Sequence, residues 1–206
     1  QPEYYNLLTK MEGFFNEGPI SELYCSQGTY LNSKTEKELT STGDILCYVS
    51  KQKGLKKYIA TDKIKHNYKY WKVITPAAAF KGTSGFSDLY ILNDEQIHSR
   101  SYISFRAENA IEAKNLHSYL RCKIVHILLS LRKQTHNLCN KNNFVWIPIV
   151  PLNEEWNNDK LHKYFGLGDT DIAFIKNVKL DGNYDSIPVG DGAPFRSDLK
   201  IQNGTH

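Results

Sequence analysis

A stripe of apolar residues between Asn109 and Lys133 constrains the fold of this chain more than any other sequence feature. Its members recur at i, i+4 and i+7, the spacing of one face of an α-helix: Leu116, Leu120, Ile124, Ile127, Leu128 and Leu131. Asn109 and Glu112 have the spacing of a capping box, which predicts that the helix begins there. We expect one long amphipathic helix with its stripe buried against a sheet.

Five short segments rich in β-branched and aromatic residues predict that sheet. They are residues 45–49, 56–59, 71–75, 88–92 and 101–105. The third is the strongest, and Pro76, which cannot continue a central strand, ends it. Helical spacing also occurs at residues 4–15, 159–165 and 170–175. The expected fold class is α+β, with a mixed β-sheet packed by one long amphipathic helix and a small helical C-terminal appendage.

Composition divides the chain into four parts. Residues 1–40 hold an N-terminal helix and a polar connection, and residues 41–155 hold the α+β domain. A short helical pair follows at 156–179, and the tail at 180–206, rich in Gly, Asp, Pro and Ser, is expected to be loosely held. We expect no membrane contact and a cytoplasmic location, because neither a spanning segment nor a signal peptide is present. The first residue, Gln1, suggests a fragment of a longer protein.

Positive charge is concentrated in one block. Residues 51–72 contain 8 Lys and one acidic residue, whereas residues 1–50 contain 3 Lys and 7 Asp or Glu. Aromatic residues are interleaved with these lysines: Tyr58, Tyr68, Tyr70 and Trp71. A solvated lysine-rich hairpin is one interpretation, and a surface for nucleic acid, with phosphate contacts beside stacking rings, is the other. Four helix residues either face solvent or extend this surface: Arg121, Lys123, Arg132 and Lys133.

Catalytic chemistry is not indicated. The four cysteines and seven histidines lack metal-ligand spacing, so neither a zinc site nor a disulfide framework is predicted. The F-x-G-x-G turn that admits S-adenosylmethionine, the N/D/S-P-P-Y/F loop of amino-methyltransferases and the G-x-S-x-G elbow of hydrolases are absent. The tripeptide Glu112-Ala113-Lys114 suits a nuclease, but its place in the first turns of the predicted helix favours a structural role. We expect no catalytic residue and no metal in this chain.

Several segments, taken in order, resemble those of a known family. They are Tyr68 to Pro76, Ser101 to Ile103, Glu112 to Leu116, Tyr119 to Leu131 and Phe144 to Leu152. Trp156, then Lys163-Tyr164-Phe165-Gly166-Leu167, then Asp171-Ile172-Ala173-Phe174-Ile175 are similar to a terminal signature of tryptophan, L-Y-K-K-Y-G-L and E-I-A-F-I. Over about residues 55–177 the chain resembles the target-recognition region of adenine-specific methyltransferases from type II restriction-modification systems, including bifunctional nuclease-methylases.

The resemblance implies a division of labour. An upstream methyltransferase domain binds S-adenosylmethionine and methylates adenine N6, and in bifunctional members the parent also cuts DNA, while this region selects the sequence in double-stranded DNA. Methyl transfer by this chain alone is not expected. The alternatives are a protein-interaction domain, docking a catalytic subunit through the apolar stripe and the region of Trp146, and a nuclease of unrecognised type.

Positions along the chain, rather than the resemblance, indicate which residues contact DNA. Phosphate contacts are predicted for seven lysines: Lys51, Lys53, Lys56, Lys57, Lys63, Lys65 and Lys69. The small-residue loop at 76–87 follows a strand, as recognition loops often do. Base reading is therefore predicted for this loop and its neighbour, at Lys81, Thr83, Ser84 and Arg100.

Overall fold

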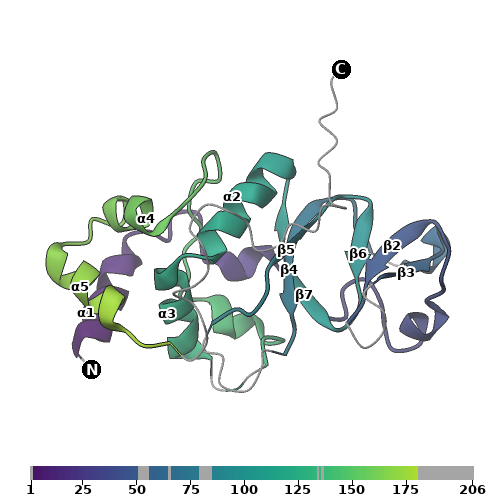
Figure 1. Cartoon of the computed structure of the whole chain (residues 1–206), viewed down its shortest axis with the longest axis horizontal. Coiled ribbons are helices and arrows are strands. Elements are labelled where there is room, and N and C mark those ends of the chain that lie inside the picture. Colours follow the sequence, from purple (N-terminus) through teal and green to yellow (C-terminus); the bar gives the residue numbers. More distant parts are fainter. Residues whose placement is uncertain are drawn as a thin grey trace.

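The computed structural model describes residues 2–50, 56–64, 66–78, 85–133, 135 and 137–180. Their architecture is α+β, which confirms the predicted fold class. Figure 1 shows helices α1, α4 and α5 at one end of the molecule and strands β2, β3 and β6 at the other. Strands β4, β5 and β7 lie between them, next to helix α2. No helix in the described part of the chain is both long enough and apolar enough to cross a membrane.

The strands form two sheets rather than one. The larger sheet has the order β1-β7-β4-β5, with antiparallel neighbours. Its centre consists of β4 (Trp71–Pro76) and β7 (Tyr102–Ala107), paired so that Val73 lies opposite Phe105. The flanking strands are β1 (Tyr24–Cys25) and β5 (Tyr90–Leu92). The outer position of β1 brings residues far apart in the sequence to one edge of this sheet.

The smaller sheet has the order β3-β2-β6. Strand β2 (Ile45–Tyr48) pairs antiparallel with β3 (Lys56–Ile59) and parallel with β6 (Gln96–His98). The sheet has its own apolar cluster, to which residues of the N-terminal third contribute: Tyr30, Leu31, Ile45, Cys47, Val49, Ile59, Tyr68 and Ile97. Two sheets with separate apolar clusters therefore meet within residues 24–107.

The single long helix predicted at residues 109–133 is wrong, because the structure has two helices there. They are α2 (Ala110–Leu120) and α3 (Lys123–Arg132), and Cys122 between them is extended, with φ −69° and ψ 140°. The cap is as predicted, since the Asn109 side chain accepts a hydrogen bond of 2.9 Å from the Glu112 backbone N–H. The apolar stripe is buried on both helices, and only Leu131 is half-buried. Periodicity missed the break because the stripe keeps its spacing across it.

The ends of the described chain pack together. Helix α1 (Pro2–Glu12) contacts α5 (Asp169–Asn177), where the rings of Tyr4 and Phe174 meet edge to face at 4.9 Å. Helix α4 (Asn158–Tyr164) precedes α5. The described residues also include four short 3₁₀ helices: η1 (Ile20–Leu23), η2 (Thr35–Glu38), η4 (Thr61–Lys63) and η5 (Lys141–Phe144).

The main core lies between the larger sheet and helices α2 and α3. The rings of Phe86 and Phe144 stack at 6.0 Å, and Phe105 of β7 meets Phe144 edge to face at 5.0 Å. All three side chains are fully buried. Because Phe144 ends η5, this packing holds the preceding residues, 137–143, against the edge of the sheet.

Candidate nucleic-acid interface

The structure describes five of the residues predicted to contact DNA, and they lie in different places. Lys51, Lys53, Lys65, Lys81, Thr83 and Ser84 are outside the described residues. Lys57 and Arg100 line one cleft of about 540 Å³, together with Lys37 and Glu36. Lys69 lines a different, larger cleft.

The remaining two predicted lysines contact residues of their own surroundings. Lys63 forms an ion pair with Glu38 at 3.3 Å, and both side chains are about half exposed. The Nζ atom of Lys56 lies 5.8 Å from the ring centroid of Tyr48, a cation–π contact. An exposed ion pair of this kind contributes little to stability, and the Lys63 side chain keeps about half of its surface in contact with solvent.

The larger cleft has a volume of about 910 Å³ and opens beside β1, β4 and β7. We call it the Tyr70 cleft. Three cationic side chains line it, from the segment before β4, from β7 and from η5: Lys69, Arg106 and Lys141. Aromatic and small polar residues of the lining include Tyr24, Ser26, Thr29, Asn67 and Tyr70. Cations next to aromatic rings in an open cleft suit a polyanion that also carries flat bases.

Two basic side chains lie near the ring of Tyr70. The guanidinium carbon of Arg106 lies 5.5 Å from the centre of its ring, and the Nζ atom of Lys72 lies 5.2 Å from it. Its hydroxyl accepts a hydrogen bond of 3.2 Å from Tyr30, and burial raises the pKa of Tyr70. Arg106 is exposed, so its charge faces the cleft from a fixed position.

Carboxylates balance part of this positive charge. Glu108 and Glu112 also line the Tyr70 cleft, and Glu112 accepts a hydrogen bond of 3.0 Å from the Glu108 backbone N–H at the start of α2. Lys141 forms an exposed ion pair with Glu22 at 3.4 Å. With Lys141 paired to Glu22, the two remaining cations of the lining, Lys69 and Arg106, are matched in number by the carboxylates of Glu108 and Glu112.

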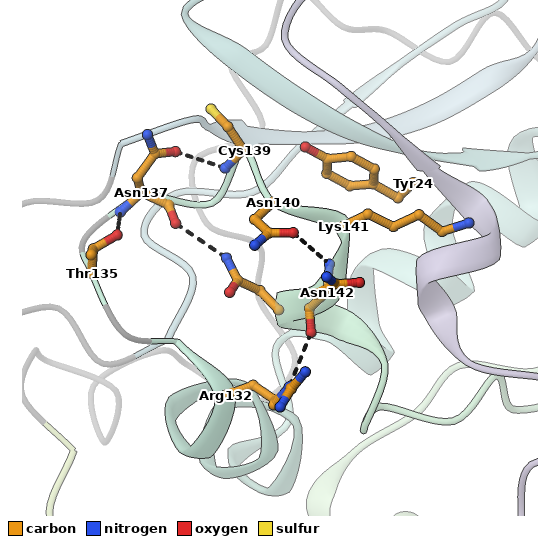
Figure 2. Close-up of a pocket in the computed structure, with 9 residues that line it drawn as sticks. Tyr24, Arg132, Thr135, Asn137, Cys139, Asn140, Lys141 and Asn142 are labelled. Atoms are coloured by element: carbon orange, nitrogen blue, oxygen red, sulfur yellow. Dashed lines mark hydrogen bonds between the residues drawn. The ribbon is translucent and has the colours of Figure 1, made fainter.

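Figure 2 shows a second cleft, of about 600 Å³. It adjoins the first, since Tyr24 and Lys141 line both. We call it the asparagine pocket. Its lining comes from β1, the end of α3 and the segment leading into η5: Tyr24, Arg132, Thr135, Asn137, Cys139, Asn140, Lys141, Asn142 and Asn143. Among the described residues, those that line this pocket include cations and amides but no carboxylate.

Backbone turns fix the amides of this pocket. The Oδ1 atom of Asn137 accepts from the Cys139 N–H at 2.7 Å, and that of Asn140 accepts from the Asn142 N–H at 3.0 Å (Figure 2). Such turns are what short Asn side chains favour. Each of these two amides therefore presents its nitrogen, a donor, to the surroundings.

Sequence reasoning did not find the asparagine pocket. The only available signal was amide density, with four Asn among residues 137–143, a stretch that also reads as an ordinary polar turn. Tyr24, Arg106 and Lys141 gave no signal, because each is unremarkable in its own segment and only the topology brings them together. Within the described residues, no group of three or more His, Cys, Asp or Glu could hold a metal ion.

Comparison with known proteins identified no relative of this chain. No protein-family model matches the chain, no curated protein is significantly similar, and no solved structure matches its fold. The functional interpretation therefore depends on the resemblance of the sequence motifs and on the chemistry of the two clefts.

Proposed function

We propose that this chain is the sequence-specific DNA-recognition region of a restriction-modification adenine-N6 methyltransferase. Binding of S-adenosylmethionine and methyl transfer belong to a separate catalytic domain in this proposal. One observation carries it: the Tyr70 cleft and the asparagine pocket adjoin at Tyr24 and Lys141, and together they present cations, rings and amides in one continuous surface. The resemblance to target-recognition regions over about residues 55–177 supports the same function.

Each side-chain type in this surface has a role in duplex recognition. Lys69 and Arg106 would contact phosphates, which supply sequence-independent affinity and position the duplex. Amides and a guanidinium would contact base edges, which supply the selection of sequence. Lys72, the last lysine of the basic block, would take no part, because its side chain is fully buried.

A docking domain for a catalytic subunit is the less favoured alternative. It requires the apolar stripe of α2 and α3 to face a partner, but Leu116, Ile124 and Leu128 are at most 1% exposed within this chain. Trp146 is half-buried beneath the guanidinium of Arg132, at 5.0 Å. The surfaces that suggested docking are thus already occupied by the chain's own residues.

Salt-dependent binding of duplex DNA tests the proposal. We expect the Lys69→Ala, Arg106→Ala double variant to bind duplexes of all sequences more weakly. The slope of log affinity against log salt should fall by about 0.9 for each phosphate that the variant no longer binds. Lys163→Ala is the matched control, since Lys163 is an exposed residue of α4 outside the linings of both clefts.

Circular dichroism of both variants would establish that the fold is intact. A wild-type protein that binds no duplex even at low salt contradicts the proposed function. A double variant with the wild-type slope would show that the phosphate contacts lie outside the Tyr70 cleft.

A further inference from the structure

We propose that the asparagine pocket reads the major-groove edge of a guanine, with Arg132 as the specificity-determining residue. This inference rests on the proposed function and goes beyond it, because it assigns a base and a residue to one part of the surface. The pocket's hydrogen-bonding capacity, the fixed position of Arg132 and the pattern of acceptors on the four bases support it in turn.

Two amides of the pocket present donors to the surroundings. The side-chain oxygens of Asn137 and Asn140 are already engaged by backbone N–H groups, whereas their Nδ2 groups have no partner among the described residues. The Nδ2 group of Asn143 is bound to the Asn137 carbonyl at 3.2 Å, which ties the two ends of the segment together. A ligand with acceptor atoms would satisfy the available donors without rearranging the turns.

Arg132 is pre-positioned at one side of this pocket. Its Nε–H donates to the Asn142 carbonyl at 3.3 Å (Figure 2), and its guanidinium stacks over the ring of Trp146 at 5.0 Å. Its two terminal amino groups make no hydrogen bond to a described residue. A planar guanidinium held by one hydrogen bond and one ring loses little entropy when its remaining edge binds two acceptors.

Among the four bases, guanine fits this pattern best. Its major-groove edge has two acceptors, N7 and O6, which arginine contacts in a bidentate manner. Adenine and cytosine each place an amino donor in the major groove, and the side-chain oxygens of Asn137 and Asn140 are already engaged and cannot accept from it. Carboxylates, the usual acceptors for the amino group of cytosine, are absent from the described residues of the lining.

A phosphate group is the other ligand with paired acceptors, and the experiment separates the two. The probes are a duplex enriched by the wild-type protein from a random pool, and copies of it with 7-deazaguanine at one guanine at a time. The modified base keeps Watson–Crick pairing but lacks the N7 acceptor. We expect one position at which this change weakens wild-type binding by about tenfold or more.

The key variant is Arg132→Lys, which keeps the charge and removes the planar fork. It should bind the enriched duplex about tenfold more weakly and bind unrelated duplexes as the wild type does. Its affinity should not change when 7-deazaguanine replaces guanine at the position identified above. The Asn140→Asp variant keeps an oxygen for the Asn142 N–H and replaces the donor by a negative charge. It should keep the wild-type melting temperature and also lose preference for the enriched duplex.

The possible failures are distinguishable. If Arg132→Lys bound all duplexes more weakly by the same factor and kept every 7-deazaguanine effect, Arg132 would be a phosphate contact. This result would overturn this inference alone. A wild-type protein that binds duplex DNA but shows no sensitivity to any modified guanine also overturns it alone. Absence of all duplex binding by the wild type would reject the proposed function and this inference together.

Discussion

The side-chain amino group of Lys72 joins the two sheets. Its Nζ atom donates to the backbone carbonyls of Tyr68, Asn93 and Gln96, at 3.1, 3.1 and 2.6 Å. The ring of Tyr30, from the cluster of the smaller sheet, lies 5.6 Å away. Strand β4 thus contributes a side chain that satisfies carbonyls on both sides of the junction, which a buried apolar residue could not do.

Replacing Lys72 by Met tests this role. The apolar side chain would leave buried carbonyls without donors, so we expect a loss of about 2–3 kcal/mol in the free energy of unfolding at pH 8.5. Urea denaturation measures it, with Lys163→Ala as the surface control. A Lys72→Met variant as stable as the wild type would show that these carbonyls find other partners.

The same variant reveals a pH dependence. Burial lowers the pKa of Lys72 to about 7, well below its ordinary value of 10.5. Between these two values the unfolded chain binds the proton and the folded chain does not, so stability rises with pH in this window. The stability difference between wild type and Lys72→Met should therefore be larger at pH 8.5 than at pH 6.5. An equal difference at both values would mean that the ammonium is not destabilised by burial.

Counting charged residues along the sequence predicted only some of the residues at the candidate surface. It counted Lys72 among eight lysines of a basic block, although burial removes this residue from any surface. It left Arg132 undecided between solvent and the basic surface, because the stacking partner Trp146 is 14 residues further along the chain. Charge is visible in a sequence, but exposure depends on contacts between distant segments.

At the scale of elements, the longer strands were predicted most accurately. Strands β2, β3 and β4 are four to six residues long and agree with the sequence pattern within one residue. Strands β1 and β6 have two and three residues, too few to show a period of two, and neither was predicted. The helix break at Cys122 went unpredicted because no glycine or proline marks it. Instead, the Asn158 side chain accepts from the Lys123 N–H at 2.8 Å, a contact from a distant segment.

Gly85 lies against helix α3, next to the buried side chain of Phe86. A Cβ atom at this position would lie 2.0 Å from the Nδ1 atom of His126 on α3, and the neighbouring Phe86 N–H donates to that nitrogen at 3.3 Å. We expect Gly85→Ala to cost about 2–3 kcal/mol, because the buried imidazole has no room to move.

Thermal or urea denaturation measures this cost. Gly28→Ala is the control, since a Cβ atom there meets nothing within 4 Å. If both variants were as stable as the wild type, Gly85 would not be held against α3 as the structure has it.

At the scale of the whole molecule, the candidate surface is a product of topology. Tyr24, Lys69, Arg106 and Lys141 come from four separate segments, and the Tyr70 cleft exists because β1 and β4 flank β7 and because η5 packs nearby. The sequence pattern predicted the α+β class and several elements correctly. It did not predict the division into two sheets, so it could not place these four residues together.

The central claim is that this chain selects a DNA sequence, and enrichment from a random pool of duplexes tests it most directly. The protein would be mixed with the pool without S-adenosylmethionine, and the bound fraction sequenced over successive rounds. We expect one motif containing at least one invariant guanine to rise above the background. A retained pool in which no motif rises above the starting pool would contradict the claim. A protein that retains no DNA in any round would contradict it as well.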